Sequence, residues 1–301
     1  MYRDYRSPRP RTYRSSITIL QDDACNDEKE PFKSYTTDIP NVKVIKANLA
    51  DDDSMTTDTI QSLLGGASFD YVWDNSSKKP VGAGKLICEL AANSWNTKLY
   101  TYVSSAGMYQ PDESTTFPMA ETTPIKEGAG QNLFDTFAID LGLPLVSFRP
   151  QYIYGPQSNK NDYIDWYFDR LVRDLPLPIP NDGTQKVSLT SSQDVAFLLA
   201  SVLDNEEAAV SQRFFNCGTD ELLSYDEVAY LCADAAGIDR TFPFRMTDFY
   251  VSPDTAKAKL GWAGSSCRLG SDLKEYYYEG YVARGGPTKK MDLAKDNEIL
   301  K

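Results

Sequence analysis

The sequence predicts an α/β protein with a doubly wound, mostly parallel sheet, followed by a smaller α+β lobe. The first observation is that short β-branched or aromatic runs alternate with helical patterns between residues 16 and 149, which favours parallel strands joined by helices. The second is a change of pattern after residue 156, where helical patterns predominate. With 301 residues, 41% of them hydrophobic, the chain can bury one large core or two modest ones.

Each predicted strand of the first part is a short run of β-branched, aromatic or aliphatic residues. The five runs are residues 16–20, 42–47, 69–74, 99–104 and 145–149. Between them apolar residues recur at helical spacing, which predicts helices over roughly 58–64, 81–94 and 129–141. We therefore expect a degenerate Rossmann-like domain over residues 16–156.

The second part of the chain, residues 157–301, is expected to form the smaller α+β lobe. Helices are predicted over 163–173, 194–203, 225–236, 253–260 and 273–281, and a strand over 214–217. Pro176, Pro178 and Pro180 predict an extended stretch after the first of these helices, since proline cannot continue a helix.

The start of the chain departs from the pattern of a dinucleotide-binding domain. Such a domain opens with a strand, a glycine-rich turn and a helix, within a βαβ unit of about 30 residues. Only fifteen residues precede the run 16–20, and they are rich in arginine and proline. We expect the sheet to lack its first strand-turn-helix, and we expect the chain not to bind NAD(P). A truncated sequence and a protein that has dispensed with this unit both stay open.

The charge of the chain is unevenly distributed. The net charge is −12, whereas residues 1–14 carry +4, so the remainder carries −16. The arginines of this basic, flexible arm (residues 1–15) are Arg3, Arg6, Arg9, Arg11 and Arg14. An acidic body repels nucleic acid and anionic membranes, while the arm is suited to RNA or to a protein partner. A disordered tail without a ligand is the alternative.

Several classes of site are excluded by composition. The chain has no histidine, which excludes a Ser-His-Asp triad and a histidine-ligated zinc site. Its five cysteines have no paired spacing, which favours free thiols in a reducing compartment. No apolar segment is long enough for a transmembrane span.

Two motifs resemble those of the extended short-chain dehydrogenase/reductases. They are Ser104-Ser-Ala-Gly-Met-Tyr109 and Ser147-Phe-Arg-Pro-Gln-Tyr-Ile-Tyr-Gly-Pro156. The resemblance implies that Ser105 holds the position of the serine that hydrogen-bonds the reacting carbonyl. The catalytic Tyr-x-x-x-Lys pair is missing, because Asn132 and Thr136 stand at its spacing. An active dehydrogenase of the usual Tyr/Lys type is therefore not expected.

The same resemblance implies a degenerate cofactor cleft at the carboxyl ends of the strands. Its candidate residues are Asn48, Asp74, Ser104, Ser105, Pro150 and Tyr152. Asp74, Asn75 and Ser105 are the candidates for catalytic residues. Asp51, from the cluster 51–53, and Asp74 are the candidates for binding Mg²⁺, which is held by one or two carboxylates with water. A solvated aspartate loop is the alternative for that cluster.

Over most of its length from Ser16, the chain resembles the chloroplast stem-loop-binding proteins, an atypical branch of these NAD-dependent epimerase/dehydratase-like proteins. The segments that carry the resemblance are Phe69–Asn75, Val103–Tyr109, Ser147–Tyr152, Trp166–Asp174, Pro178–Pro180, Phe215–Cys217 and Leu260–Trp262. The resemblance implies plastid RNA binding, an association with metal-dependent endoribonuclease activity, and location in the chloroplast stroma or on the stromal face of a plastid complex. The chain departs from the family at Leu189–Ser192, where relatives have a histidine, and in its few basic residues.

Two main hypotheses of function follow. The first is a plastid RNA-associated protein, for stem-loop binding, processing or stabilisation, on a dehydrogenase-like scaffold without oxidoreductase activity. The second is a non-catalytic structural subunit of a large photosynthetic, ribosomal or transcription assembly. A working NAD(P) enzyme ranks last. Both main hypotheses allow protein partners and homo- or hetero-oligomers.

Overall fold

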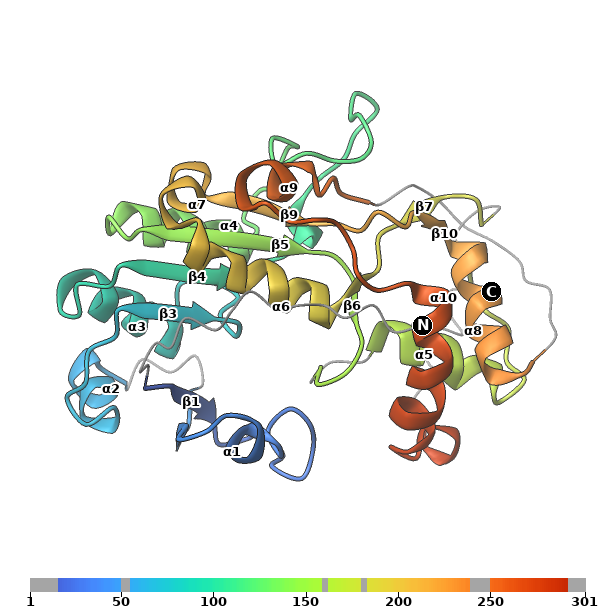
Figure 1. Ribbon diagram of the computed structural model, residues 1–301, viewed down its shortest axis with the longest axis horizontal. Coiled ribbons are helices and arrows are strands. Elements are labelled where there is room, and N and C mark those ends of the chain that lie inside the picture. Colours follow the sequence, from blue (N-terminus) through green and yellow to red (C-terminus); the bar gives the residue numbers. More distant parts are fainter. Residues whose placement is uncertain (1–15, 50–54, 159–161, 180–182, 239–249, 292–301) are drawn as a thin grey trace.

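The computed structural model describes residues 16–49, 55–158, 162–179, 183–238 and 250–291 (Figure 1). Its main sheet has four parallel strands in the order β3-β4-β5-β9. The strands are β3 (Tyr71–Asp74), β4 (Leu99–Val103), β5 (Leu145–Pro150) and β9 (Phe214–Cys217). The predicted parallel, Rossmann-like α/β sheet is therefore confirmed.

A second pair of parallel strands lies beside this sheet without hydrogen-bonding to it (Figure 1). The pair consists of β1 (Thr18–Asp22) and β2 (Lys43–Ala47), with the short helix α1 (Tyr35–Asp38) between them. A doubly wound sheet has a central first strand between its two halves. Among the described residues no strand lies between β1 and β3.

Helices cover both faces of the main sheet. On one face lie α2 (Thr57–Leu63), α3 (Gly82–Asn93) and α4 (Gly130–Asp140), and on the other α6 (Ser192–Ser201), α7 (Glu206–Gln212) and α9 (Asp254–Leu260). Figure 1 shows α6 crossing the front of the sheet. The sides alternate along each strand, so Tyr100 and Tyr102 pack against α4 while Leu99 packs on the opposite face.

The position of β9 corrects one expectation. The sequence placed this strand in the smaller lobe, but it pairs with β5 from Ser147↔Phe214 to Pro150↔Cys217. Phe215 and Cys217 are fully buried in the core of the main sheet. The domain boundary expected between residues 156 and 157 stays a prediction. After it, β9 brings the chain back into the main sheet.

The smaller lobe packs around a second core that is rich in aromatic side chains. Its helices are α5 (Asp162–Leu171), α8 (Tyr225–Ala236) and α10 (Leu269–Glu275), continued by the π-helix η3 (Tyr276–Val282). The predicted helix over 273–281 is therefore the end of α10 together with η3. Short strand pairs are β6 (Ile153–Tyr154) with β8 (Thr190–Ser191), and β7 (Lys186–Val187) with β10 (Leu223–Ser224). The remaining 3₁₀ turns are η1 (Ala106–Met108), η2 (Val202–Asp204) and η4 (Gly286–Thr288).

The bounds of α8 match the predicted helix because local signals mark both ends. Ser224 and Glu227 form a capping box, in which the Ser224 hydroxyl accepts from the Glu227 backbone and the Glu227 carboxylate accepts from the Ser224 backbone. Gly237 ends the helix in the left-handed conformation, at φ 69°.

Candidate functional site

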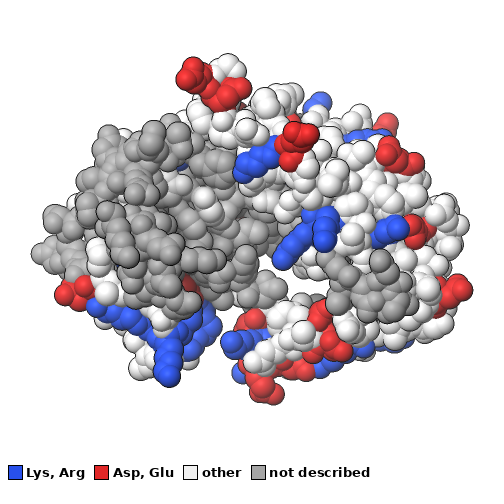
Figure 2. All heavy atoms as spheres, turned by 180° about the vertical axis from the view of Figure 1, so that it is seen from behind, with Lys and Arg blue, Asp and Glu red and all other residues white. Residues whose placement is uncertain are grey.

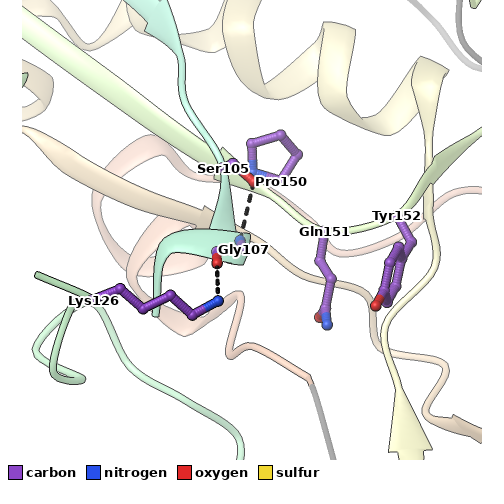
Figure 3. Close-up of a pocket in the computed structure, with 6 residues that line it drawn as sticks. All are labelled: Ser105, Gly107, Lys126, Pro150, Gln151 and Tyr152. Carbon is purple, nitrogen blue, oxygen red and sulfur yellow. Dashed lines mark hydrogen bonds between the residues drawn. The ribbon is translucent and has the colours of Figure 1, made fainter. Parts of the chain in front are cut away.

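A cavity of about 360 Å³ opens at the carboxyl ends of β4 and β5 (Figure 3). Its walls come from the segments that follow these two strands and from the segment before α4. The lining residues are Ser105, Gly107, Lys126, Pro150, Gln151 and Tyr152. Three of them, Ser105, Pro150 and Tyr152, are among the residues that the sequence assigned to the cleft.

Ser105 lies at the start of η1, immediately after β4. Its hydroxyl oxygen accepts a hydrogen bond from the backbone N–H of Gly107, at 3.0 Å. This bond fixes the turn after the strand in the way that an N-cap serine does. A hydroxyl has one proton and two lone pairs, so Ser105 can also donate to a ligand in the cavity.

Lys126 reaches the cavity from the segment that precedes α4. Its ammonium donates to the carbonyl of Gly107, at 2.7 Å, and its backbone N–H donates to Met108. Because an ammonium has three N–H donors, two more are available beyond the Gly107 contact. Lys126 therefore places a positive charge at the mouth of the cavity.

Gln151 and Tyr152 point into the cavity from the segment after β5, on the side away from Lys126 (Figure 3). Gln151 is only 3% exposed. The Tyr152 ring stacks on Tyr163 of α5, with centroids 4.0 Å apart and 15° between planes. Tyr152 has a φ of 34°, in the region that L-residues rarely adopt. Packing on α5 holds the ring at the cavity wall.

The Tyr-Gly-Pro end of the motif docks this segment against α6. Gly155 has a φ of 114°, and a Cβ at this position would lie 2.9 Å from the Ser192 hydroxyl oxygen. The Ser192 hydroxyl donates to the Pro156 carbonyl, and Tyr154 donates to Asp272 at 2.9 Å. Only glycine adopts this positive φ without strain and has no Cβ to meet Ser192, which explains its place in the motif.

A buried polar network connects the segments that form the cavity walls. Arg149, 2% exposed, donates to the Tyr109 hydroxyl at 3.0 Å, and Tyr109 donates to Asn216 at 2.7 Å. The backbone N–H of Asn216 donates in turn to the carboxylate of Glu121, at 2.8 Å. The network ties β5 and β9 to the segment that ends at Lys126.

Arg149 also forms a buried salt bridge with Asp135 of α4, at 3.5 Å, and both side chains are 2% exposed. Burial raises the pKa of Asp135 from 3.8 to about 6, although Ser147 and Arg149 oppose this shift. The ion pair therefore links α4 to β5, the strand whose carboxyl end contributes to the cavity wall.

The raised pKa of Asp135 predicts a pH-dependent stability. Since the folded state binds this proton more tightly than the unfolded state, the contribution is largest at low pH and is lost as pH rises through about 6. Relative to Asp135→Asn, we expect the free energy of unfolding to fall by about 1.4 kcal/mol between pH 5 and pH 7.5. Urea unfolding in dilute solution measures this difference, and a difference that does not change with pH would contradict the assignment.

Comparison with known proteins identifies the family. Residues 78–218 match the model of the NAD dependent epimerase/dehydratase family. A chloroplast stem-loop binding protein of 41 kDa from Arabidopsis thaliana is 30% identical over 266 residues, which cover 81% of this chain and 67% of that protein. The chain belongs to the chloroplast stem-loop binding protein family. The resemblance drawn from the motifs is thus confirmed, as is the expected chloroplast localisation, since the relative is a chloroplastic protein.

More distant relatives share the epimerase-like scaffold of the family. A trifunctional UDP-glucose 4,6-dehydratase, epimerase and reductase of Arabidopsis thaliana is 25% identical, over 80% of this chain but 39% of that protein. Among solved structures, UDP-glucuronic acid 4-epimerase from Bacillus cereus, in complex with NAD, has a TM-score of 0.66 at 17% identity, and the match covers 88% of this chain and 91% of that one. A double mutant of the dTDP-glucose 4,6-dehydratase DesIV from Streptomyces venezuelae has a TM-score of 0.67 at 16% identity, over 89% of each chain.

The described residues fit only part of a nicotinamide dinucleotide site. Ser105, Pro150 and Tyr152 form a cleft at the expected place. The part of the chain that the structure describes has no strand between β1 and β3, and so no turn there to hold a pyrophosphate. Neither Asn132 nor Thr136 is among the described residues that line the cavity. The Bacillus cereus epimerase is in complex with NAD, and the expectation that this chain binds no NAD stays a prediction.

Other predicted site residues lie elsewhere or have structural contacts. One carboxylate oxygen of Asp74 accepts from the backbone of Ser76 and Ser77, both at 3.0 Å, and the other accepts from Tyr100. Ser104 is buried behind the cavity, with its N–H donating to Phe148. Asn48 and Asn75 are exposed. Neither these two residues nor Asp74 and Ser104 line the cavity.

The remaining candidates fall outside the described residues. These are Asp51 and the arm arginines Arg3, Arg6, Arg9, Arg11 and Arg14. Within the described ranges no group of three or more Asp, Glu or Cys side chains is placed to hold a metal ion. No described helix combines the length and apolar character needed to cross a membrane.

Sequence reasoning did not find Lys126 and Gln151. Gln151 lies inside the motif between Pro150 and Tyr152, so its position in the motif was an available signal. Lys126 has no such signal in the sequence. It is brought to the cavity by an isolated β-bridge between Tyr109 and Ile125, which are far apart in the chain.

Proposed function

We propose that this protein is a plastid RNA-associated protein that uses an epimerase-like scaffold to bind stem-loop RNA without oxidoreductase activity. The observation that carries the proposal is the relative named as a stem-loop binding protein, which matches this chain over 81% of its length. The absence of the Tyr-x-x-x-Lys pair from α4 supports it, because Asn132 and Thr136 cannot serve as the acid and its supporting ammonium.

The charge of the surface is consistent with limited RNA contact on the body. Figure 2 shows Lys and Arg side chains beside a central hollow, interspersed with Asp and Glu. A surface of mixed sign attracts a polyanion weakly, whereas residues 1–14 carry +4. We therefore assign most of the salt-dependent affinity to the arm.

Removal of residues 1–14 is expected to weaken binding of a labelled stem-loop RNA at least tenfold at low salt. If the five arginines each contact a phosphate, the slope of log affinity against log salt should become shallower by about 3 to 5. Fluorescence anisotropy over a salt series measures both quantities. Replacing all five arginines by lysine is the matched control, since it keeps the charge and should keep the slope.

The alternative is a structural subunit in a plastid assembly. No binding by the full chain at low salt, with Mg²⁺ present, would refute the RNA proposal and favour this alternative. Cleavage is a separate question, and the same samples run on a denaturing gel test it. Shortened RNA that appears only with Mg²⁺ would point to a metal-dependent centre. Asp51 is then the remaining candidate, because both carboxylate oxygens of Asp74 are engaged by Ser76, Ser77 and Tyr100.

A further inference from the structure

We propose that the cavity at the ends of β4 and β5 holds a single unpaired nucleotide of the bound RNA, with its base beside Tyr152 and its phosphate at Lys126. This inference rests on the proposed function and adds the feature of the RNA that is recognised. An unpaired base in a loop or bulge can be turned outward into a cavity, whereas a base within a duplex must first be unpaired and unstacked, at a cost in free energy.

The cavity has the size and the aromatic wall that a nucleotide needs. Its volume of about 360 Å³ is within the range of small-molecule sites. The Tyr152 ring is fixed by stacking on Tyr163, so it does not need to be ordered when a base packs beside it. Stacking on aromatic side chains is the usual way in which proteins hold unpaired bases.

The other walls provide polar groups at suitable positions. Gln151 projects into the cavity next to Tyr152 (Figure 3), and an amide can both donate to and accept from the edge of a base. Ser105 lies on the opposite wall with Gly107, where its hydroxyl can donate to a ribose or phosphate oxygen. Base and backbone would therefore contact different walls.

The side of the cavity near Lys126 is suited to an anion. The Lys126 ammonium has two N–H donors beyond its contact with Gly107. Four residues later, Gly130 begins α4 and lies against the loop after β3, where a Cβ at Gly130 would approach the Lys78 carbonyl to 2.5 Å. This packing places the Lys78 backbone against the start of α4, and the first turns of α3 and α4 have no acidic residue. Glu127 is the nearest acidic residue in sequence.

The test uses a hairpin RNA with 2-aminopurine at one unpaired loop position, and a duplex of equal length with the same base paired. On binding to the full chain, we expect the loop probe to change in fluorescence and the duplex probe to change little. Lys126→Met and Tyr152→Leu should each weaken hairpin binding at least fivefold and abolish the fluorescence change, while duplex binding stays within twofold. Tyr152→Phe, which keeps the ring, should retain both the hairpin binding and the fluorescence change of the full chain.

Matched controls separate the cavity from general effects. Lys274→Met removes an exposed ammonium on α10, and Tyr278→Leu removes a ring that is 61% exposed on η3. Neither should change the loop signal. Circular dichroism and thermal unfolding establish that each variant is folded, and Lys126→Met provides the test should Tyr152→Leu fail to fold.

The outcomes distinguish this inference from the function on which it rests. Equal losses of hairpin and duplex binding, or unchanged hairpin binding in both cavity variants, would refute the nucleotide site while leaving RNA association intact. Displacement of the loop signal by an equimolar amount of AMP would also refute it, because the cavity would then be a site for free nucleotides. No binding of either RNA by the full chain would refute the proposed function itself.

Discussion

Replacement of Arg149 by methionine is expected to lower the free energy of unfolding by about 3–5 kcal/mol, because it leaves a buried carboxylate without its partner. Arg149 is paired with Asp135 at 3.5 Å and donates to the Tyr109 hydroxyl and the Glu121 carbonyl. Its guanidinium also lies 4.3 Å from the centre of the Phe214 ring. Methionine fills a similar volume but supplies none of the polar contacts.

The measurement is urea unfolding at pH 7.5, followed by tryptophan fluorescence. The double variant Asp135→Leu with Arg149→Met is the control, since apolar side chains in place of both charges are often neutral or stabilising. We expect it to be more stable than Arg149→Met alone. In the single variant the pKa of Asp135 should rise above about 6, because the Arg149 charge no longer lowers it. A double variant that is no more stable than Arg149→Met would contradict the view that the unpaired Asp135 carboxylate causes the loss.

Replacement of Phe134 by alanine is expected to cost about 3–5 kcal/mol of stability through the cavity that it leaves. Phe134 is fully buried, and its ring centroid lies 4.5 Å from that of Tyr102 and 6.4 Å from that of Tyr100. These contacts hold α4 on β4. Because α4 begins four residues after Lys126, the same packing positions one wall of the cavity.

Leu133→Ala is the matched control for this prediction, since Leu133 is the preceding residue of α4 and is 48% exposed. It should change the free energy of unfolding by less than about 1 kcal/mol. Thermal or urea unfolding of both variants under one condition provides the comparison. Similar losses in the two variants would mean that the face of α4 packed on the sheet has been assigned wrongly.

Local patterns predicted most elements with bounds close to those of the structure. α8 and β9 match residue for residue, because capping residues mark both ends of the first, and the second begins with Phe214 and Phe215 and is followed by Gly218. The assignment of β9 to a lobe was wrong for a physical reason. A strand pattern shows only that a segment is buried. Its pairing with Phe148 and Pro150 of β5 depends on the path of the chain between the two strands.

The candidate site was predicted in part. Ser105, Pro150 and Tyr152 were found because they lie in two motifs that resemble those of the extended short-chain dehydrogenase/reductases. Both motifs stand at the carboxyl ends of parallel strands, which meet at one edge of the sheet. The same rule placed Asp74 at the site, yet its carboxylate is engaged by Ser76, Ser77 and Tyr100 in a turn after β3. Whether an aspartate caps a turn or faces a ligand is decided by the local backbone, which a pattern of residue types does not record.

The sequence by itself determined the alternation of strands and helices, the family motifs, the missing Tyr-x-x-x-Lys pair and the contrast between a basic arm and an acidic body. These are properties of neighbouring residues and of composition. Only the tertiary structure brought Lys126 to Ser105, stacked Tyr152 on Tyr163, paired Asp135 with Arg149 and left β1 and β3 in separate sheets. Each of these depends on how segments distant in the chain pack together, which is decided by the whole core rather than by local preference.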